Sequence, residues 1–153
     1  MKVIVAGSRT IQDYNLVSTI ISNTIHTYHI SVDELVQGLA KGVDTLARSW
    51  ALSNSIPPKD FLPKWDDITV PGALVRRNKW GKLYNVLAGH MRNEEMAHYV
   101  AANGGGALIA IWDFKSTGTK DMIHRAFNHK LFIYVYKTGS PNLVAIPLDT
   151  KDL

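Results

Sequence analysis

Residues 2–9, KVIVAGSR, join an apolar run to a sharp stop. The run is rich in β-branched side chains, which is typical of a strand buried on both faces, and Gly7 ends it. Without a Cβ, this glycine lets the backbone come close to a ligand. Ser8 and Arg9 add a hydroxyl and a planar guanidinium suited to phosphate or carboxylate. The stretch predicts a first parallel strand followed by an anion-binding turn, although a plain turn with a solvated arginine fits equally well.

Apolar runs and helix-like stretches continue to alternate along the chain. Further strands are expected at Glu34–Gln37, Lys59–Leu62, Ala107–Trp112 and Leu131–Tyr136, with an edge strand at Asn142–Leu148. Helices are expected at Asp13–Thr27, with Asp13 as N-cap, and at Gly42–Asn54, Arg92–Ala102 and Thr119–Asn128. The alternation predicts an α/β fold: a Rossmann-like, doubly wound, mostly parallel five-stranded sheet with helices on both faces.

The chain length of 153 residues predicts one domain, residues 1–153. Residues 64–88 interrupt the alternation, and we expect a long loop with helical pieces close to the site, because long insertions in compact domains are usually functional. Trp65, Trp80 and Tyr84 lie in it and offer rings for stacking on a base, or for packing in a core. Residues 137–153 form a carboxy-terminal extension.

The composition excludes several kinds of chemistry. The absence of cysteine rules out disulfides, thiolate catalysis and zinc held by sulfur. The histidines lack metal-ligand spacing, so we expect no metal and no cofactor. No apolar run approaches the ~20 residues of a membrane span. Lys2 leads straight into a strand, so we expect a cytoplasmic protein with no signal peptide and no membrane partner. The net charge of +4 permits an anionic partner.

A second glycine-containing turn follows the second expected strand, in the segment QGLAKGVD at residues 37–44. Gly38 and Gly42 flank the turn, Lys41 adds a cation, and free backbone N–H groups at the following helix could bind an anion. Asp44 lies in the first turn of that helix. It is a candidate for bonding a ribose hydroxyl, and capping of the helix is an equally good interpretation.

Two further segments place polar groups next to helix starts. After the most apolar strand come Asp113, Ser116, Gly118 and Thr119, which combine hydroxyls with the free N–H groups of a helix N-terminus. This is the best phosphate candidate in the sequence, and Asp113 either contacts the ligand or caps the turn. In the other segment, Arg92 is a candidate for phosphate and Asn93 for a base or sugar.

Taken together, four segments resemble the YspA-like branch of the SLOG superfamily, which includes the Smf/DprA DNA-processing proteins and the LOG ("lonely guy") phosphoribohydrolases. The similarity extends from about Met1 to Tyr136. The segments are GSR at Gly7–Arg9, GLAKGVD at Gly38–Asp44, AGHMRNEEM at Ala88–Met96 and GTKDM at Gly118–Met122.

The resemblance implies a Rossmann-like fold and a pocket that senses or sequesters a nucleotide or an ADP-ribose-like ligand. Phosphates would be held by Gly7, Ser8, Arg9, Gly38, Gly118 and Thr119, and the sugar or base would be read by Asp44, Arg92 and Asn93. Paired subunits are common in the superfamily, so a homo-oligomer is expected on that basis.

Two relatives imply alternative functions. LOG enzymes cleave nucleoside 5'-monophosphates with a glutamate that aligns with Met122, and methionine cannot shuttle a proton. A phosphoribohydrolase would therefore need Asp121 or Glu95 as its carboxylate. DprA-type proteins bind single-stranded DNA and have a segment similar to QGLAKGVD. Here the alternative would use the basic residues between positions 76 and 82.

Overall fold

The structure is a computed structural model that describes residues 1–153. Its centre is a six-stranded sheet with the strand order β3-β2-β1-β6-β7-β8. The strands are β1 (Lys2–Gly7), β2 (Glu34–Gln37), β3 (Pro58–Asp60), β6 (Gly106–Trp112), β7 (Phe132–Lys137) and β8 (Ile146–Pro147). All neighbours are parallel except β7 and β8. The predicted doubly wound fold is confirmed, with the short antiparallel edge strand β8 as a sixth strand.

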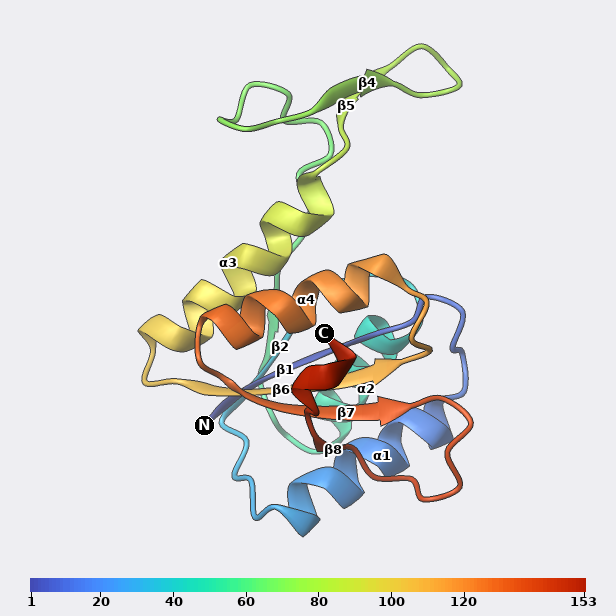
Figure 1. The fold of residues 1–153 in the computed structure, drawn as a ribbon, viewed down its shortest axis with the longest axis vertical. Helices are drawn as coiled ribbons and strands as arrows, with labels where there is room; N and C mark the ends of the chain where they lie inside the picture. Colours follow the sequence, from blue (N-terminus) through green and yellow to red (C-terminus); the bar gives the residue numbers. More distant parts are fainter.

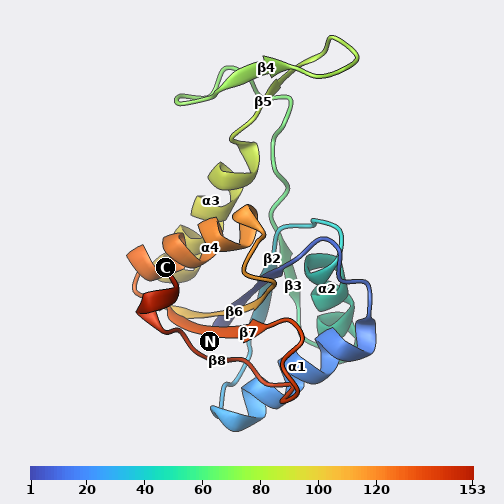
Figure 2. The same cartoon turned by 45° about the vertical axis from the view of Figure 1, so that its right-hand side comes forward.

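Helices cover both faces of this sheet (Figures 1 and 2). On one face lie α1 (Tyr14–Thr27) and α2 (Val43–Ser53), and on the other α3 (Ala88–Ala102) and α4 (Thr117–Asn128). A 3-10 helix, η1 (Thr150–Asp152), follows β8. Each face has its own core of buried side chains, one around Ile20 and Trp50 and the other around Met96 and Ile123.

Local sequence explains several of these elements. Asp13 caps α1 as predicted, since its carboxylate accepts a hydrogen bond of 3.1 Å from the backbone N–H of Leu16. The strand β6 is buried along its whole length because helices cover both of its faces, which is why its sequence is a continuous apolar run. Its carboxyl end lies beside that of β1, where the strand order reverses. In doubly wound sheets this switch point is where ligands bind.

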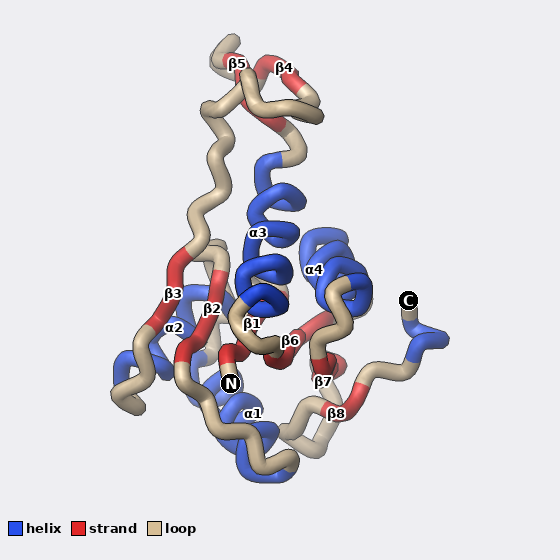
Figure 3. The backbone as a smooth tube through the Cα atoms, turned by 90° about the vertical axis from the view of Figure 1, so that its left-hand side faces the viewer, coloured by secondary structure: helices blue, strands red, loops and turns tan.

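The insertion differs from the prediction. Instead of helical pieces it contains an antiparallel ribbon, β4 (Val75–Arg77) and β5 (Leu83–Asn85). We refer to residues 62–87 as the arm. Figures 1 and 3 show the ribbon projecting past the start of α3, away from the sheet. The helical prediction was wrong because Asn78 and Gly81 form a tight turn that pairs the flanking residues as strands.

Candidate functional site

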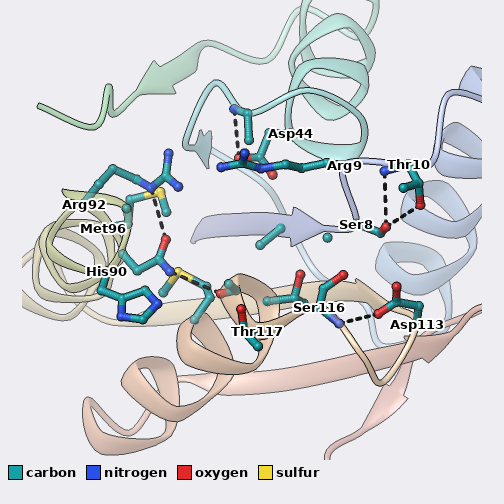
Figure 4. A pocket seen from close by; sticks show the side chains of 18 of the residues that line it. Ser8, Arg9, Thr10, Asp44, His90, Arg92, Met96, Asp113, Ser116 and Thr117 are labelled. Carbon is teal, nitrogen blue, oxygen red and sulfur yellow. Dashed lines mark hydrogen bonds between the residues drawn. The ribbon is translucent and has the colours of Figure 1, made fainter. Parts of the chain in front are cut away.

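A cavity of about 380 Å³ opens at the carboxyl ends of β1 and β6. Its walls come from the turns after these strands, the loop before α2, the first turns of α3 and α4, and the base of the arm. Most of the predicted ligand residues line it (Figure 4): Gly7, Ser8, Arg9, Asp44, Arg92, Asn93, Asp113, Ser116, Gly118 and Thr119. The volume lies within the usual range of small-molecule sites.

The turn after β1 contributes one free cation. The Ser8 hydroxyl is buried and lies 2.8 Å from the Thr10 hydroxyl, so it orders the turn. Arg9 is exposed and forms no ion pair. The arginines that do form ion pairs are Arg48 and Arg125. In Figure 4 the Arg9 side chain extends beside Asp44. Its guanidinium is therefore available to an anion in the cavity.

The protein itself uses part of the set of donors that the glycines of the turn before α2 predicted. The Asp44 carboxylate accepts hydrogen bonds from the N–H groups of Gly38 and Ala40, at 3.2 and 3.3 Å, and the Val43 N–H donates to the Ser8 carbonyl at 3.3 Å. Gly38, Lys41 and Gly42 lie outside the cavity lining. Because the protein itself satisfies these donors, the turn acts as structural support for the cavity wall.

Asp44 lines the cavity and ties the turn before α2 through Gly38 and Ala40, but it does not cap the helix, which has no side-chain cap. Only 5% of its surface is exposed. Burial raises its pKa to about 6, and the Arg92 charge and the two backbone donors oppose that rise. The cavity thus holds a carboxyl group that changes charge near neutral pH.

Arg92 is a buried guanidinium at the back of the cavity. Its Nη1 donates to the Gly38 carbonyl oxygen, and its Nε donates to the Asn93 side-chain oxygen at 3.1 Å. Both partners are neutral, and Arg92 forms no ion pair. Burial lowers its pKa, partly offset by the charge of Asp44. A buried cation with only neutral hydrogen-bond partners favours an anion in the adjoining space.

The Asn93 side chain is occupied within the protein. Its Nδ2 donates to Asp121 at 2.9 Å and to the Gly118 carbonyl at 3.3 Å, while its oxygen accepts from Arg92. It therefore positions Arg92 and the start of α4, and its polar atoms are already used. The side chain of Asp113 likewise caps its own turn, accepting from the N–H groups of Lys115 and Ser116 at 2.8 and 2.7 Å.

Two helix N-termini face the cavity with unsatisfied donors. In α4 the backbone N–H groups of residues 117–119 have no acceptor in the protein, and Ser116 makes no side-chain cap. Because α3 begins at Ala88 and not at Arg92 as predicted, its first turn also reaches the cavity through Gly89 and His90. It too lacks a side-chain cap. Uncapped helix N-termini attract anions through both their N–H groups and the helix dipole.

The candidate catalytic carboxylates lie outside the cavity lining. Asp121 accepts hydrogen bonds from Asn93 and from Arg125, both at 2.9 Å, and Glu95 is exposed. Met122, in contrast, is buried and lines the cavity. The resemblance matches this methionine to the LOG glutamate, so a lining position that would hold a carboxylate in such an enzyme holds a thioether side chain here.

Several residues that line the cavity are not among the predicted ligand residues. Thr10, Gly89 and His90 line the cavity, and so does Trp65 at the base of the arm, which was considered for stacking on a base or for packing in a core. Gly89 is packed close to Trp65, since a Cβ at Gly89 would lie 3.6 Å from the indole ring. The AGHM segment before Arg92 was the available signal for Gly89 and His90. Only long-range packing brings Trp65 to them.

Two other kinds of feature are absent from the structure. No group of three or more histidine, aspartate or glutamate side chains is arranged to hold a metal ion. No helix has both the length and the apolar character that crossing a membrane requires.

Comparison with known proteins gives a family match and a structural match. Residues 1–67 match YAcAr, the YspA, cpYpsA-related SLOG family. The fold is similar to the X-ray structure of DNA processing protein A (DprA) from Streptococcus pneumoniae, with a TM-score of 0.62 and 22% identity over 93% of this chain. The chain spans about half of that protein, 52% of its length. No curated protein sequence matches the chain. The family match confirms the resemblance to the YspA-like branch of the SLOG superfamily over residues 1–67, and the structural match confirms the fold.

Proposed function

We propose that the protein binds a nucleotide or a nucleotide-derived ligand such as an ADP-ribose-like molecule, as a sensor or sequestering protein. The family match and the DprA-like fold support a role related to nucleotides or nucleic acids. The observation that carries the proposal is that the free N–H groups at the start of α4 and the unpaired Arg92 guanidinium belong to one cavity.

The phosphate end of the ligand would lie between α4 and the two arginines. The N–H groups of residues 117–119 bind phosphate oxygens at the helix start. Arg92 supplies a charge that is already desolvated and held in place by Gly38 and Asn93, so little conformational entropy is lost on binding. Arg9 adds a second positive charge from the wall that faces the start of α4, where its guanidinium is free to form a bidentate contact with phosphate.

The sugar and base would extend toward the base of the arm. Trp65 lines the cavity and is 38% exposed, so part of its aromatic side chain is accessible to a base. The Asp44 carboxyl lies on the same wall as Arg9 and is a candidate acceptor for a ribose hydroxyl. Binding without chemistry is favoured because the cavity presents Met122 at the position where a glycosidic hydrolase needs a carboxylate.

A thermal shift and calorimetry panel of nucleotides, cyclic nucleotides and ADP-ribose tests the proposal. Arg9→Gln should weaken binding about 10- to 100-fold, since it removes a charge-assisted hydrogen bond worth ~1.5–3 kcal/mol. Lys41→Gln removes the same charge from an exposed position outside the cavity, and it should leave the affinity within about twofold. No thermal shift and no binding heat with any member of the panel would end the proposal.

The phosphoribohydrolase alternative makes a separate prediction. Incubation with nucleoside 5'-monophosphates would release free base, and Asp121→Asn or Glu95→Gln would abolish that release. We expect no release, because neither carboxylate lines the cavity. Base release that depends on either residue would replace simple binding with hydrolysis.

A further inference from the structure

We infer that the arm is a second binding element, one that holds single-stranded nucleic acid without sequence preference. Bases would stack on Trp80, and the phosphates would contact the basic side chains around it. The inference uses residues at the tip of the arm, none of which lines the cavity. It therefore stands or falls independently of the small-molecule site.

The arm carries most of the chain's net charge. Of the 17 basic residues in the sequence, five lie in residues 62–87, against two of the 13 acidic residues, so the arm accounts for +3 of the net +4. Lys82 pairs with Asp66 at 3.0 Å, but Arg76 and Lys79 have no carboxylate partner. The cations are therefore concentrated on a projection from the body, where they are open to a polyanion (Figure 3).

The tip is an ordered turn that displays an indole ring. The Asn78 side-chain oxygen accepts hydrogen bonds from the N–H groups of Trp80 and Lys82, at 2.9 and 3.0 Å. The Asn78 N–H donates to the Lys82 carbonyl at 2.9 Å. Yet Trp80 is 78% exposed, with the Lys79 ammonium 4.5 Å from its ring centre. A large aromatic ring exposed on a rigid turn does nothing for the core, but it is pre-organised for a partner.

A second aromatic residue lies on the ribbon next to a cation. Arg76 in β4 is directly opposite Tyr84 in β5, so their side chains share one face of the ribbon. The ribbon thus pairs Arg76 with Tyr84, and the adjoining tip pairs Lys79 with Trp80, so each aromatic ring lies next to a cation. Proteins that bind single strands combine a basic track with aromatic platforms in this way.

The aromatic rings favour a single strand over a duplex. A base stacks on an indole through its flat face, and in a duplex those faces are covered by neighbouring base pairs. An anionic membrane surface would match the charge and the exposed Trp80. However, the cations continue back along β4 to Arg76, which suits an extended polyanion better than a surface met by the tip alone.

The test measures fluorescence anisotropy of a labelled single strand of about 20 nucleotides, which is longer than a typical binding site. DNA and RNA strands are used, with the matching duplex and vesicles containing phosphatidylserine as competitors. Trp80→Ala should weaken single-strand binding about 5- to 150-fold at every salt concentration, as expected for the loss of one stacked base. Phe132→Ala is the control, because it removes an exposed aromatic side chain (63% exposed) from the body.

The charge contribution is separated by its salt dependence. Arg76→Gln with Lys79→Gln should reduce the slope of log affinity against log salt by about 1.4, at ~0.7 per cation for single strands. Lys130→Gln with Lys151→Gln changes the net charge equally on exposed residues of the body, and the slope should then stay as in the wild type. All four positions are exposed, so the variants are expected to fold.

Several outcomes would overturn the inference. One is that the wild type and Trp80→Ala bind the single strand with equal affinity. A second is that the duplex binds more tightly than the single strand. A third is that vesicles bind in a Trp80-dependent way while single strands do not bind. Sedimentation in which Trp80→Ala only converts a dimer to a monomer would assign the tip to self-association and would also overturn it.

Discussion

The guanidinium of Arg92 fills the space that a side chain at Gly38 would need. Its Nη1 donates to the Gly38 carbonyl oxygen, and a Cβ built on Gly38 would lie 2.6 Å from Cζ and 2.9 Å from Nε of Arg92. The glycine at the end of β2 therefore serves the arginine and not the ligand directly. Its absence of a side chain lets a buried cation reach the back of the cavity.

Gly38→Ala should displace the Arg92 side chain and so weaken anion binding, at only a small cost in the free energy of unfolding. The atoms that the new methyl group meets are the far end of a flexible side chain, so Arg92 can move while the backbone stays. We expect a loss of about 1 kcal/mol in the free energy of unfolding, at the low end for overpacking. In an Arg92→Ala background the same substitution should cost less, and a double-mutant cycle of urea unfolding measures the difference.

Gly106→Ala is the matched control for that experiment. A methyl group at Gly106 would overlap the backbone carbonyl oxygen of Lys2 and would lie 2.7 Å from the Val100 side chain. Because backbone must move, the cost should exceed that of Gly38→Ala and approach ~3 kcal/mol. If both substitutions cost the same, with no coupling to Arg92, the assigned role of Gly38 is incorrect.

Asp44 should make stability depend on pH between about 4 and 6. Burial raises its pKa to about 6 from the usual 3.8, so the folded state holds this proton more tightly than the unfolded state does. Its stabilising contribution is complete below the unfolded pKa and is lost as pH rises through about 6. Relative to Asp44→Asn, the wild type should gain about 2 kcal/mol in the free energy of unfolding between pH 7.5 and pH 4.5.

Urea unfolding of both proteins across this pH range measures that difference directly, because the other titrating groups are common to the pair. A difference that is flat with pH would mean that Asp44 keeps an ordinary pKa. A difference of the opposite sign would mean that Arg9 and Arg92 hold the carboxylate ionised more strongly than burial opposes it.

Substitutions at Gly118 should affect ligand binding without destabilising the fold. A Cβ at this position meets no atom within 4 Å, and the backbone is in a region open to all residues. Gly118→Ala should therefore raise the free energy of unfolding by about 0.4–1 kcal/mol, through lower entropy of the unfolded chain. Gly118→Leu should retain a stable fold but crowd the free N–H groups at the start of α4, and calorimetry should show at least about tenfold weaker ligand binding. Unchanged affinity in the leucine variant would remove α4 from the phosphate site.

Trp65 should contribute to the affinity only for ligands that contain a base. Trp65→Ala removes the aromatic wall of the cavity, so affinity for AMP or ADP-ribose should fall about fivefold or more, as for the loss of one stacking contact. Affinity for ribose 5-phosphate, which has no base, should stay within about twofold. An equal loss for both ligands would show that Trp65 shapes the cavity without stacking. Phe132→Ala, which removes an exposed aromatic side chain outside both the cavity and the arm, is the control.

Local patterns were enough to predict the sheet and most of the cavity. Buried parallel strands are continuous apolar runs, and in such sheets the turns after the strands meet at one edge, so KVIVAGSR and the segment from Asp113 to Thr119 could be placed together. The Asp13 cap was readable because a capping side chain acts within three residues of itself.

Only the tertiary structure decided which backbone N–H groups of these turns already have an acceptor within the protein. The two glycines of QGLAKGVD resemble those of an anion-binding loop, but Asp44 accepts from the N–H groups of Gly38 and Ala40, and the Ser8 carbonyl accepts from that of Val43, which lies 35 positions away in the sequence. The sequence by itself determined the architecture, because apolar periodicity and turn chemistry are local. The packing of distant residues determined that Arg92 remains unpaired, that Trp65 reaches the cavity and that Trp80 does not, because satisfied hydrogen bonds and burial depend on neighbours that no local pattern specifies.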